Sequence, residues 1–311
     1  MTTAASVRAS RLARWRDSDL AYSFRRSPVA LVSAAVLAVC LAGAMFAPWV
    51  APHNPFDLAT LNLGDALTPP AWTPGGQRTY LLGTDDQGRD VLSAIIFGSR
   101  MSLLVGLLAT LLSMVAGVSL GLVSGYVGGK VDALIMRIAD IQLSFPAILI
   151  ALLVDGVARA VFKNRVDDQL ALYVIVIAIA ASGWVRYART VRGSTLVERN
   201  REYVQAARVI GRHPLAIMFT HVLPNALGPV LVLVTLHIGE AIITESILSF
   251  LGVGVPPTQP SLGTLIRIGN DFLFSGEWWI TVFPGAALVI LVLAINVLGD
   301  WLRDALNPRL R

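Results

Sequence analysis

The chain has 311 residues, of which 55% are hydrophobic and only 14% are charged, and its formal net charge is +5. A soluble domain usually carries about 25% charged residues, so this composition excludes a water-soluble globular protein. The single cysteine, Cys40, excludes an internal disulfide and a multi-cysteine metal site.

Six apolar segments approach the roughly 20 residues that a helix needs to cross a bilayer. They are residues 29–50, 101–125, 133–154, 170–185, 226–247 and 281–301. Pro146, Pro229 and Pro284 lie inside them, but neighbouring helices support prolines in membrane spans. The first segment follows an arginine-rich stretch, yet its length exceeds the 7–15 apolar residues of a signal peptide. The sequence therefore predicts an all-α membrane protein with six transmembrane helices.

The basic residues predict the orientation of these helices. If the N-terminus is cytoplasmic, the inner segments are 1–28, 126–137, 186–224 and 302–311, and they hold 18 of the 25 Lys and Arg residues. Cytoplasmic loops carry an excess of Lys and Arg. Both termini are therefore predicted to be cytoplasmic.

The first outer segment, 51–100, is long enough for a small ordered cap. Thr84 and Gln87 have the spacing of a capping box, and the apolar residues that follow, from Val91 to Ile96, fall on one helical face. Two interpretations remain open at this point. The helix either rests on the outer membrane surface or merely extends the second span.

The inner segment 186–224 is unusually long for a connection between two helices, and long ordered loops are commonly functional. Thr195 and Glu198 have capping-box spacing, Gly211 stands where a C-terminal cap belongs, and Pro214 follows. This pattern predicts a helix over residues 196–210. Its charged surface fits either anionic lipid headgroups or a groove of a partner protein.

The stretch from Arg201 to Gly211, followed by the run His221–Asn225, resembles the EAA loop of binding-protein-dependent ABC importer permeases. The motif is a Glu-Ala-Ala triplet, then Gly four residues later, then Leu-Pro. Here Gln205 replaces the glutamate, while Glu202 lies one turn earlier. The resemblance implies that an ATPase subunit contacts this segment, through Arg201, Glu202, Tyr203, Gln205, Ala206, Ala207, Arg208 and Gly211.

Three further blocks are similar to the C-type permeases of dipeptide, oligopeptide and nickel importers. They cover residues 82–92, 245–254 and 299–308; in the last, Trp301 and Asn307 stand where the family more often has Gly and Asp. The resemblance covers nearly the whole chain from residue 24. It implies a type I ABC importer permease in the bacterial inner membrane. Its partners would be a homologous second permease, two ABC ATPase subunits or domains, and an extracytoplasmic substrate-binding protein.

Three acidic residues lie within predicted spans, where charge is costly and commonly functional. Asp140 is near the inner end of the third span and has Arg137 one turn away, so a local ion pair is the favoured interpretation. Glu240 and Glu245 lie towards the outer end of the fifth span. All three are candidates for the translocation pathway, and anchoring roles remain open.

The sequence lacks the motifs of other functional classes. The four histidines have no zinc-site spacing, so no metal is expected. The Gly125–Val131 stretch departs from a phosphate-binding loop in spacing and has Val131 in place of Ser or Thr. The chain is therefore expected to be no enzyme, to hold no cofactor, to bind no nucleic acid and to leave ATP hydrolysis to its partners. An ion-gradient-driven transporter and a permease for nickel or haem are the alternatives.

The predicted organisation has three parts. Residues 1–28 are a cytoplasmic N-terminal segment, and residues 29–100 hold the first span and the outer segment. Residues 101–311 form a five-helix permease core that includes the coupling loop 186–224.

Overall fold

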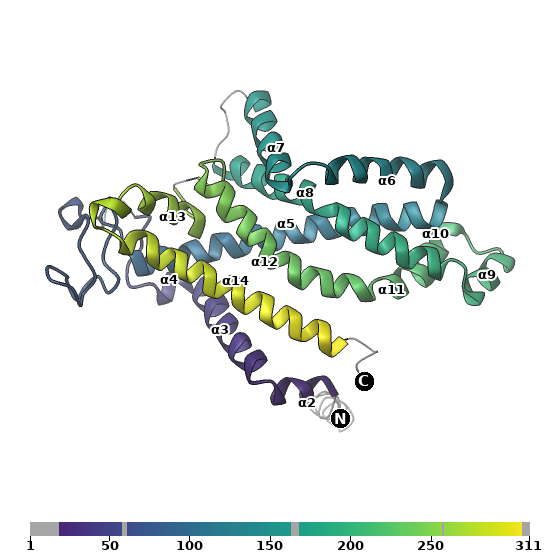
Figure 1. The fold of residues 1–311 in the computed structure, drawn as a ribbon, viewed down its shortest axis with the longest axis horizontal. Coiled ribbons are helices and arrows are strands. Elements are labelled where there is room, and N and C mark those ends of the chain that lie inside the picture. The colour runs from purple at the N-terminus through teal and green to yellow at the C-terminus, as the bar shows by residue number, and fades with distance from the viewer. Residues whose placement is uncertain (1–18, 58–60, 163–167, 257, 307–311) are drawn as a thin grey trace, which may run out of the picture.

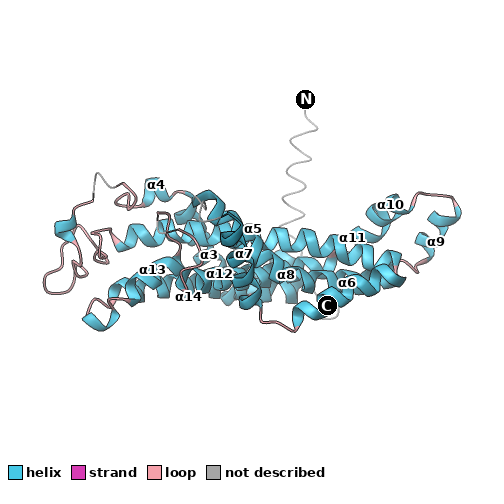
Figure 2. Ribbon diagram, turned by 90° about the horizontal axis from the view of Figure 1, so that it is seen from above, coloured by secondary structure: helices cyan, strands magenta, loops and turns pink. Residues whose placement is uncertain are grey.

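A computed structural model describes residues 19–57, 61–162, 168–256 and 258–306, and this part of the chain is almost wholly helical. Most long helices run along the long axis of the molecule, while α7 points away from it (Figure 1). Viewed from above, α9 and α10 form one end and α13 with the neighbouring loops forms the other (Figure 2). The elements are α2 (Asp19–Arg26), α3 (Pro28–Met45), α4 (Ala47–Val50), η1 (Leu63–Asp65), α5 (Val91–Val127), α6 (Gly129–Leu143), α7 (Ala147–Phe162), α8 (Asp168–Glu198), α9 (Glu202–Val209), α10 (Pro214–Ile217), η2 (Met218–Val222), α11 (Leu223–Ala226), α12 (Gly228–Phe250), α13 (Leu262–Asn270), η3 (Leu273–Ser275) and α14 (Trp279–Leu306).

Five helices in the described residues are individually long and apolar enough to cross a membrane: α3, α5, α8, α12 and α14. The bent pair α6 and α7 supplies a sixth crossing if the two are counted as one span. The protein is therefore an all-helical, multi-pass membrane protein, as the apolar segments predict.

The third span is not the single helix predicted over residues 133–154. It breaks after Leu143, and α6 and α7 meet at 98°. Pro146 has no N–H to donate and disfavours helical backbone at the residue before it, so it ends one helix and begins the next. The carbonyl of Pro146 accepts hydrogen bonds from the N–H groups of Leu149 and Ile150, which open α7.

The bend is anchored by Gln142 on α6. Its amide nitrogen donates to the carbonyl oxygen of Ala181 at 2.6 Å, and its amide oxygen accepts from the indole N–H of Trp184 at 2.7 Å. Both partners lie on α8. The end of α6 is therefore held at a defined point along α8.

α5 and α8 pack so closely that the contact positions on α5 have room only for glycine. A Cβ atom at Gly117 would lie 2.3 Å from the carbonyl oxygen of Trp184, and one at Gly121 would lie 2.4 Å from that of Ala188. A Cβ atom at Gly125 would lie 2.7 Å from the Cβ atom of Thr195. The contacts advance in the same order along both helices, so α5 and α8 run parallel. Small residues at four-residue spacing let membrane helices approach to backbone contact.

The fourth span is longer than predicted. Its helix, α8, continues from the expected end at Val185 to Glu198, and α7 continues past the expected end of the third span at Val154 to Phe162. Thr195 therefore does not cap a new helix, because it is buried inside α8 against α5. The predicted helix 196–210 is replaced by the end of α8 and the short helix α9.

The outer segment forms an ordered cap over one end of the helices. Thr84 is no helix cap, since its hydroxyl donates to the carbonyl of Asp65 and accepts from the N–H of Thr68. The N-cap of α5 is Asp90, whose carboxylate accepts from the N–H of Ser93 at 3.0 Å. Because α5 then runs without a break for 37 residues, the amphipathic start of this helix extends the second span.

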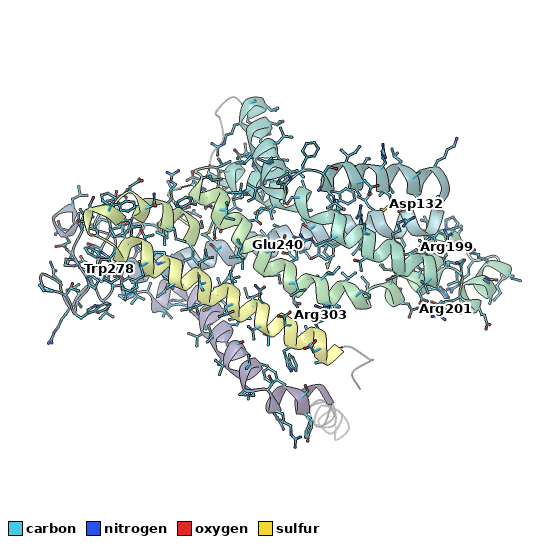
Figure 3. All side chains as sticks on the ribbon, in the orientation of Figure 1. Asp132, Arg199, Arg201, Glu240, Trp278 and Arg303 are labelled. Carbon is cyan, nitrogen blue, oxygen red and sulfur yellow. The ribbon has the colours of Figure 1, made fainter. Side chains whose placement is uncertain are left out.

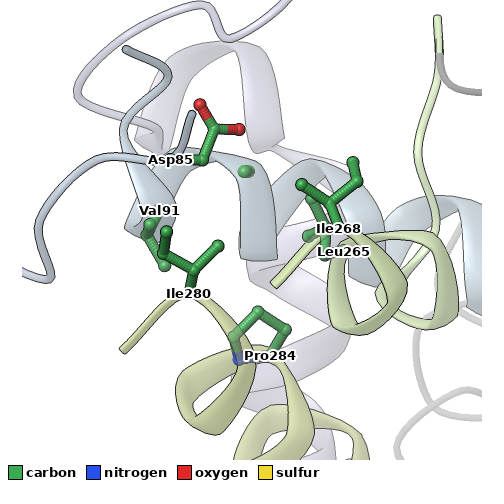
Figure 4. Close-up of a pocket in the computed structure, with 7 residues that line it drawn as sticks. Asp85, Val91, Leu265, Ile268, Ile280 and Pro284 are labelled. Carbon is green, nitrogen blue, oxygen red and sulfur yellow. The ribbon is translucent and has the colours of Figure 1, made fainter. Parts of the chain in front are cut away.

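A buried ion pair stabilises the cap, and a long-range hydrogen bond joins the cap to the helices. The guanidinium of Arg89 donates to the carboxylate of Asp85 at 2.6 Å, and both side chains are almost fully buried. The indole N–H of Trp279 donates to the carbonyl of Thr84 at 3.0 Å, which ties α14 to the cap. Beneath Asp85 lies a cavity of about 10 Å³ between α5, α13 and α14 (Figure 4). A volume of that size holds about one water molecule, so it offers no room for cargo.

We expect Gly117→Ala and Gly121→Ala each to lower the thermal unfolding midpoint of the detergent-purified protein. The added methyl group meets backbone atoms that cannot rotate away, and overpacking of this kind costs about 1–3 kcal/mol. Gly193→Ala on α8 is the matched control, because a Cβ there meets nothing within 4 Å. Equal midpoints for all three variants would show that the close approach of α5 and α8 is not required.

Candidate functional site

The helix α9 stands at one end of the molecule, beside α10 (Figure 2). Val204 and Ala207 are buried, three residues apart on one face of α9, and they join a cluster that includes Tyr187 and Val191 of α8 and Ile217. Residues three apart lie next to one another on a helix surface. The opposite side of α9 is left exposed, which explains why this short helix keeps a defined position without being enclosed.

The end of α9 is closed by Gly211, as the sequence predicts. Gly211 has a φ of +81°, a conformation that glycine adopts at little cost. Its N–H donates to the carbonyl of Arg208, and the N–H of Arg212 donates to that of Ala207. These two bonds form a Schellman motif, which satisfies the last carbonyls of the helix and turns the chain sharply.

The residues predicted to contact an ATPase are mostly exposed on this end. Arg201, Glu202, Tyr203, Gln205, Ala206, Arg208 and Gly211 are exposed, and only Ala207 faces inward. Two apolar residues extend the same surface, Val209 at 88% exposure and Ile210 at 81%. Leu215 and Phe219 are exposed nearby in the chain. Apolar side chains gathered on an exposed surface mark a site of protein or membrane contact.

Polar contacts connect α9 to the helices beside it. Arg201 lies 3.7 Å from the carboxylate of Glu198 at the end of α8, and the hydroxyl of Tyr203 donates to the same carboxylate. The amide nitrogen of Asn225 donates to that hydroxyl at 3.1 Å. Burial and the neighbouring Glu198 raise the pKa of Tyr203, so the phenol stays protonated and remains a donor. The guanidinium of Arg208 lies 5.3 Å from the ring centre of Tyr126 on α5.

A second group of charged residues lies away from α9, where α6, α8 and α12 meet. Arg186, Arg189 and Arg192 follow one another at three-residue steps along α8, and each forms an ion pair with an acid from another helix. The acids are Glu240 on α12 and Asp140 and Asp132 on α6. We call these six residues the charged face. Figure 3 shows Glu240 about midway along the molecule and Asp132 closer to Arg199 and Arg201.

The partner of Asp140 is not Arg137, as predicted, but Arg189 on α8. Arg137 lies on the same helix as Asp140 and is exposed. An ion pair with an arginine of a packed neighbour fixes two helices together, whereas a pair within one helix only adds a few tenths of a kcal/mol. The tertiary contact therefore prevails over the local one.

The three ion pairs differ in exposure. The side chains of Arg186 and Glu240 are 39% and 48% exposed, and those of Arg189 and Asp140 are 48% and 55% exposed. Arg192 and Asp132 are more covered, at 33% and 19%, and the hydroxyl of Ser124 donates to the same carboxylate. The pairs of Arg186 and Arg189 thus have polar atoms that a ligand can reach. The pair of Arg192 mainly joins α6 to α8.

Glu245 is enclosed by the chain's own helices. Its carboxyl group is 0% exposed and accepts from the hydroxyl of Ser102 on α5 at 2.9 Å and from that of Ser249 at 2.7 Å. The oxygen of Ser102 in turn accepts from the N–H of Leu262, which opens α13. This cluster joins α5, α12 and α13, and it presents no carboxylate to an open surface.

The family of the chain follows from a match over most of its length. Residues 117–311 match the family described as binding-protein-dependent transport system inner membrane component, and residues 14–70 match the N-terminal TM domain of oligopeptide transport permease C. The chain belongs to this permease family. The match includes α6, α8, α9 and α12, and therefore both groups of residues described above.

Individual relatives agree over nearly the full chain. The dipeptide transport system permease protein DppC of Escherichia coli (strain K12) is 43% identical over 289 residues, which are 93% of this chain and 91% of the relative. The di/tripeptide transport system permease protein DppC of Pseudomonas aeruginosa (strain UCBPP-PA14) is 41% identical over 86% of this permease and 84% of the relative. The oligopeptide transport system permease protein OppC of Bacillus subtilis (strain 168) is 37% identical over 96% and 91%.

A solved structure has the same fold. It is the inward-facing MetNI methionine ABC transporter, with a TM-score of 0.54 and 19% sequence identity. The similarity covers 69% of this permease and 96% of the MetNI chain. It supports the arrangement of the helices in the permease.

The arginines of the charged face are not predicted as site residues from the sequence, in which Arg186, Arg189 and Arg192 count only as cytoplasmic charges. Their three-residue spacing directly after an apolar segment is the signal that marks them. Cations at that spacing follow one side of a helix. Their partners, Asp132, Asp140 and Glu240, depend on which helices pack together, and that is decided only in the tertiary structure.

We expect Glu245→Leu to destabilise the permease by about 1–3 kcal/mol, because it leaves buried hydroxyl groups without an acceptor. Glu245→Gln keeps one side-chain oxygen in place and is expected to cost less. The thermal midpoints of the detergent-purified variants measure the difference. A Glu245→Leu variant as stable as the unaltered permease would contradict a joining role for this cluster.

Proposed function

We propose that this permease is one membrane-spanning subunit of an ATP-driven importer of short peptides. The observation that carries the proposal is the 43% identity to a dipeptide permease over 93% of the chain. Relatives with peptide-transport names include both dipeptide and oligopeptide permeases, which favours peptides over nickel or haem as cargo. The subunit forms half of the translocation pathway, and a homologous second permease forms the other half.

The proposed partner at α9 is an ATPase subunit. The exposed surface combines apolar residues, Val209 and Ile210, with Glu202, Gln205 and Arg208. A mixture of apolar anchors and charged groups is typical of a helix that docks into a partner's groove. In the complete importer two ATPase subunits or domains bind the two permeases, and ATP is hydrolysed there and not in this chain. No resident cofactor or metal is needed in the permease for this role.

The contacts of α9 explain how nucleotide-driven motion reaches the membrane helices. α9 is packed on α8 through the cluster around Val204 and is held to α5 by Arg208 over the ring of Tyr126. The guanidinium of Arg199, at the end of α8, also donates to the carbonyl of Gly125 on α5 at 2.7 Å. Helices that are packed in this way move as bodies. A displacement of α9 is therefore passed to α5 and α8 together.

The distribution of basic residues supports an orientation with α9 and both termini in the cytoplasm. The opposite end, with α13 and the cap over residues 61–90, then faces outward and receives cargo from a substrate-binding protein. The apolar helices lie in the lipid bilayer of the bacterial inner membrane. No nucleic acid takes part in this arrangement.

Within the membrane we assign the pathway role to Asp140 and Glu240. Each is the acid of an exposed ion pair of the charged face. Charged groups at membrane depth face protein or water and not lipid, because the cost in lipid is about 2.5–3.5 kcal/mol even on the lowest scales. Glu245 is assigned to the enclosed cluster that joins α5, α12 and α13.

We expect Gly211→Ala and Glu202→Ala, each tested in the reconstituted importer, to lower ATP hydrolysis stimulated by the cargo-loaded binding protein. Alanine at the φ of +81° of Gly211 costs about 1–2 kcal/mol, or about 5–30-fold in the population of the folded turn. Pull-down of the ATPase subunits and phosphate release measure assembly and coupling separately.

The matched control is Gly276→Ala in the loop before α14. Gly276 also has a positive φ, +109°, and a Cβ meets nothing within 4 Å at either glycine. The control carries backbone strain at the opposite end of the molecule, so pull-down of the ATPase subunits is expected to stay unchanged. If both glycine variants lost the ATPase subunits equally, or if neither Gly211→Ala nor Glu202→Ala altered assembly or hydrolysis, α9 would not be the coupling element.

A further inference from the structure

The pair of Arg186 and Glu240 lies deep in the membrane-spanning part of the permease. Glu240 follows the start of α12 by 12 residues and precedes its end by 10. At 1.5 Å per residue it is therefore about 15 Å or more from either end of the helix. Figure 3 places it between Trp278 at one end of the molecule and Arg201 at the other. Such a depth corresponds to the centre of a bilayer about 30 Å thick.

The two side chains face each other fork to fork. The guanidinium of Arg186 donates through one nitrogen to each carboxylate oxygen, at 2.7 Å to Oε1 and by a second bond to Oε2. This bidentate geometry suits any carboxylate, including one carried by a ligand. With 39% and 48% of their side chains exposed, both groups keep polar atoms free for further contacts.

The backbone behind the pair is tightly fixed. The hydroxyl of Tyr187, next to Arg186, is 3.0 Å from Nδ1 of His237, one turn before Glu240, and both side chains are buried. A Cβ at Gly183 would lie 2.4 Å from the ring of His237, so α8 and α12 are in close contact there. The pair is thus presented from a rigid base. It is not needed to hold these two helices together.

We infer that Arg186 and Glu240 form a cargo site at the middle of the translocation pathway, which takes the two charged termini of a peptide by exchange of ion-pair partners. The inference rests on the proposed peptide-importer function. The peptide's carboxylate binds Arg186, and its α-ammonium group binds Glu240. Four charges are then paired in place of two, and no charge is left without a partner.

Exchange explains why a matched pair suits this cargo. A single charge buried in a low-dielectric site is costly, so an unpaired Arg186 or Glu240 would oppose passage. A dipeptide carries both charges within about 7 Å, at about 3.5 Å per residue. It therefore satisfies both side chains at once. A cargo with one blocked terminus leaves one of them unpaired.

The second exposed pair continues the same route. Arg189 lies one turn after Arg186 on α8, towards α9, and Asp140 pairs with it from α6. This second pair carries the same two charges, one positive and one negative, one helical turn closer to α9. A peptide that leaves the first pair therefore meets a second pair of the same kind, which lowers the cost of the charge while it moves.

The test uses the complete importer reconstituted in proteoliposomes, with radiolabelled dialanine as the probe. We expect the double variant Arg186→Met with Glu240→Leu to assemble, since the pair is partly exposed and Tyr187 and His237 hold α8 against α12 without it. Its dialanine uptake is expected to fall about tenfold or more, because charge-assisted bonds to both termini are lost. The control double variant, Arg192→Met with Asp132→Leu, alters the covered pair and is expected to keep uptake.

The outcomes separate the two proposals. If the unaltered importer does not take up dialanine, the peptide function is wrong. If it does, and the Arg186→Met with Glu240→Leu variant transports at the same rate, the peptide function stands and the exchange site is refuted.

If that double variant fails to assemble, a second measurement tests whether Arg186 and Glu240 form the exchange site. The chain has one cysteine, Cys40, so Cys40→Ala gives a background for the single variants Thr244→Cys and Leu293→Cys. Thr244 lies one turn after Glu240 on α12, and its hydroxyl donates to the carbonyl of Glu240 at 2.8 Å, so this variant leaves the pair intact. Leu293 is 60% exposed on the apolar helix α14. A membrane-impermeant thiosulfonate reagent is expected to modify the Thr244→Cys variant faster, and dialanine is expected to slow that reaction. Equal rates, or no protection by dialanine, would refute the exchange site.

Discussion

The backbone contact between α5 and α8 is the constraint on which the rest of the permease depends. Gly117, Gly121 and Gly125 bring α5 against the carbonyl groups and small side chains of α8. In a bilayer, the hydrophobic effect does not drive helices together, so close packing and polar contacts have to do so. With these two helices in place, α6 is attached to α8 through Gln142, and α12 through Tyr187 and His237.

The same pair of helices links the two groups of residues to which we assign function. At one end α8 leads into α9, whose position is set by the buried residues Val204 and Ala207. Midway along, α8 carries Arg186 and Arg189 opposite acids of α12 and α6. A movement imposed on α9 therefore shifts the arginines relative to their partners. In this way the proposed ATPase contact and the proposed cargo site become parts of one mechanical unit.

Charge inside the membrane is placed in two distinct ways. Glu245 is covered on all sides and its oxygens are occupied by serine hydroxyls, which makes it part of the packing of α5, α12 and α13. Glu240, five residues earlier on the same helix, is paired but open. The two acids look alike in the sequence. Only the helices that surround them make Glu245 part of the packing and leave Glu240 open for the proposed cargo site.

The sequence by itself determined the class of the protein, the approximate position of its apolar spans, the cap at Gly211 and the motif of α9, because each depends on residues close together in the chain. Hydropathy, capping and turn chemistry are local properties. The bend between α6 and α7, the pairing of Asp140 with Arg189, the burial of Thr195 inside α8 and the enclosure of Glu245 were decided only in the tertiary structure. Each of these depends on which helices meet and at what depth, and the energy of an ion pair or a buried hydroxyl is set by neighbours far away in the chain.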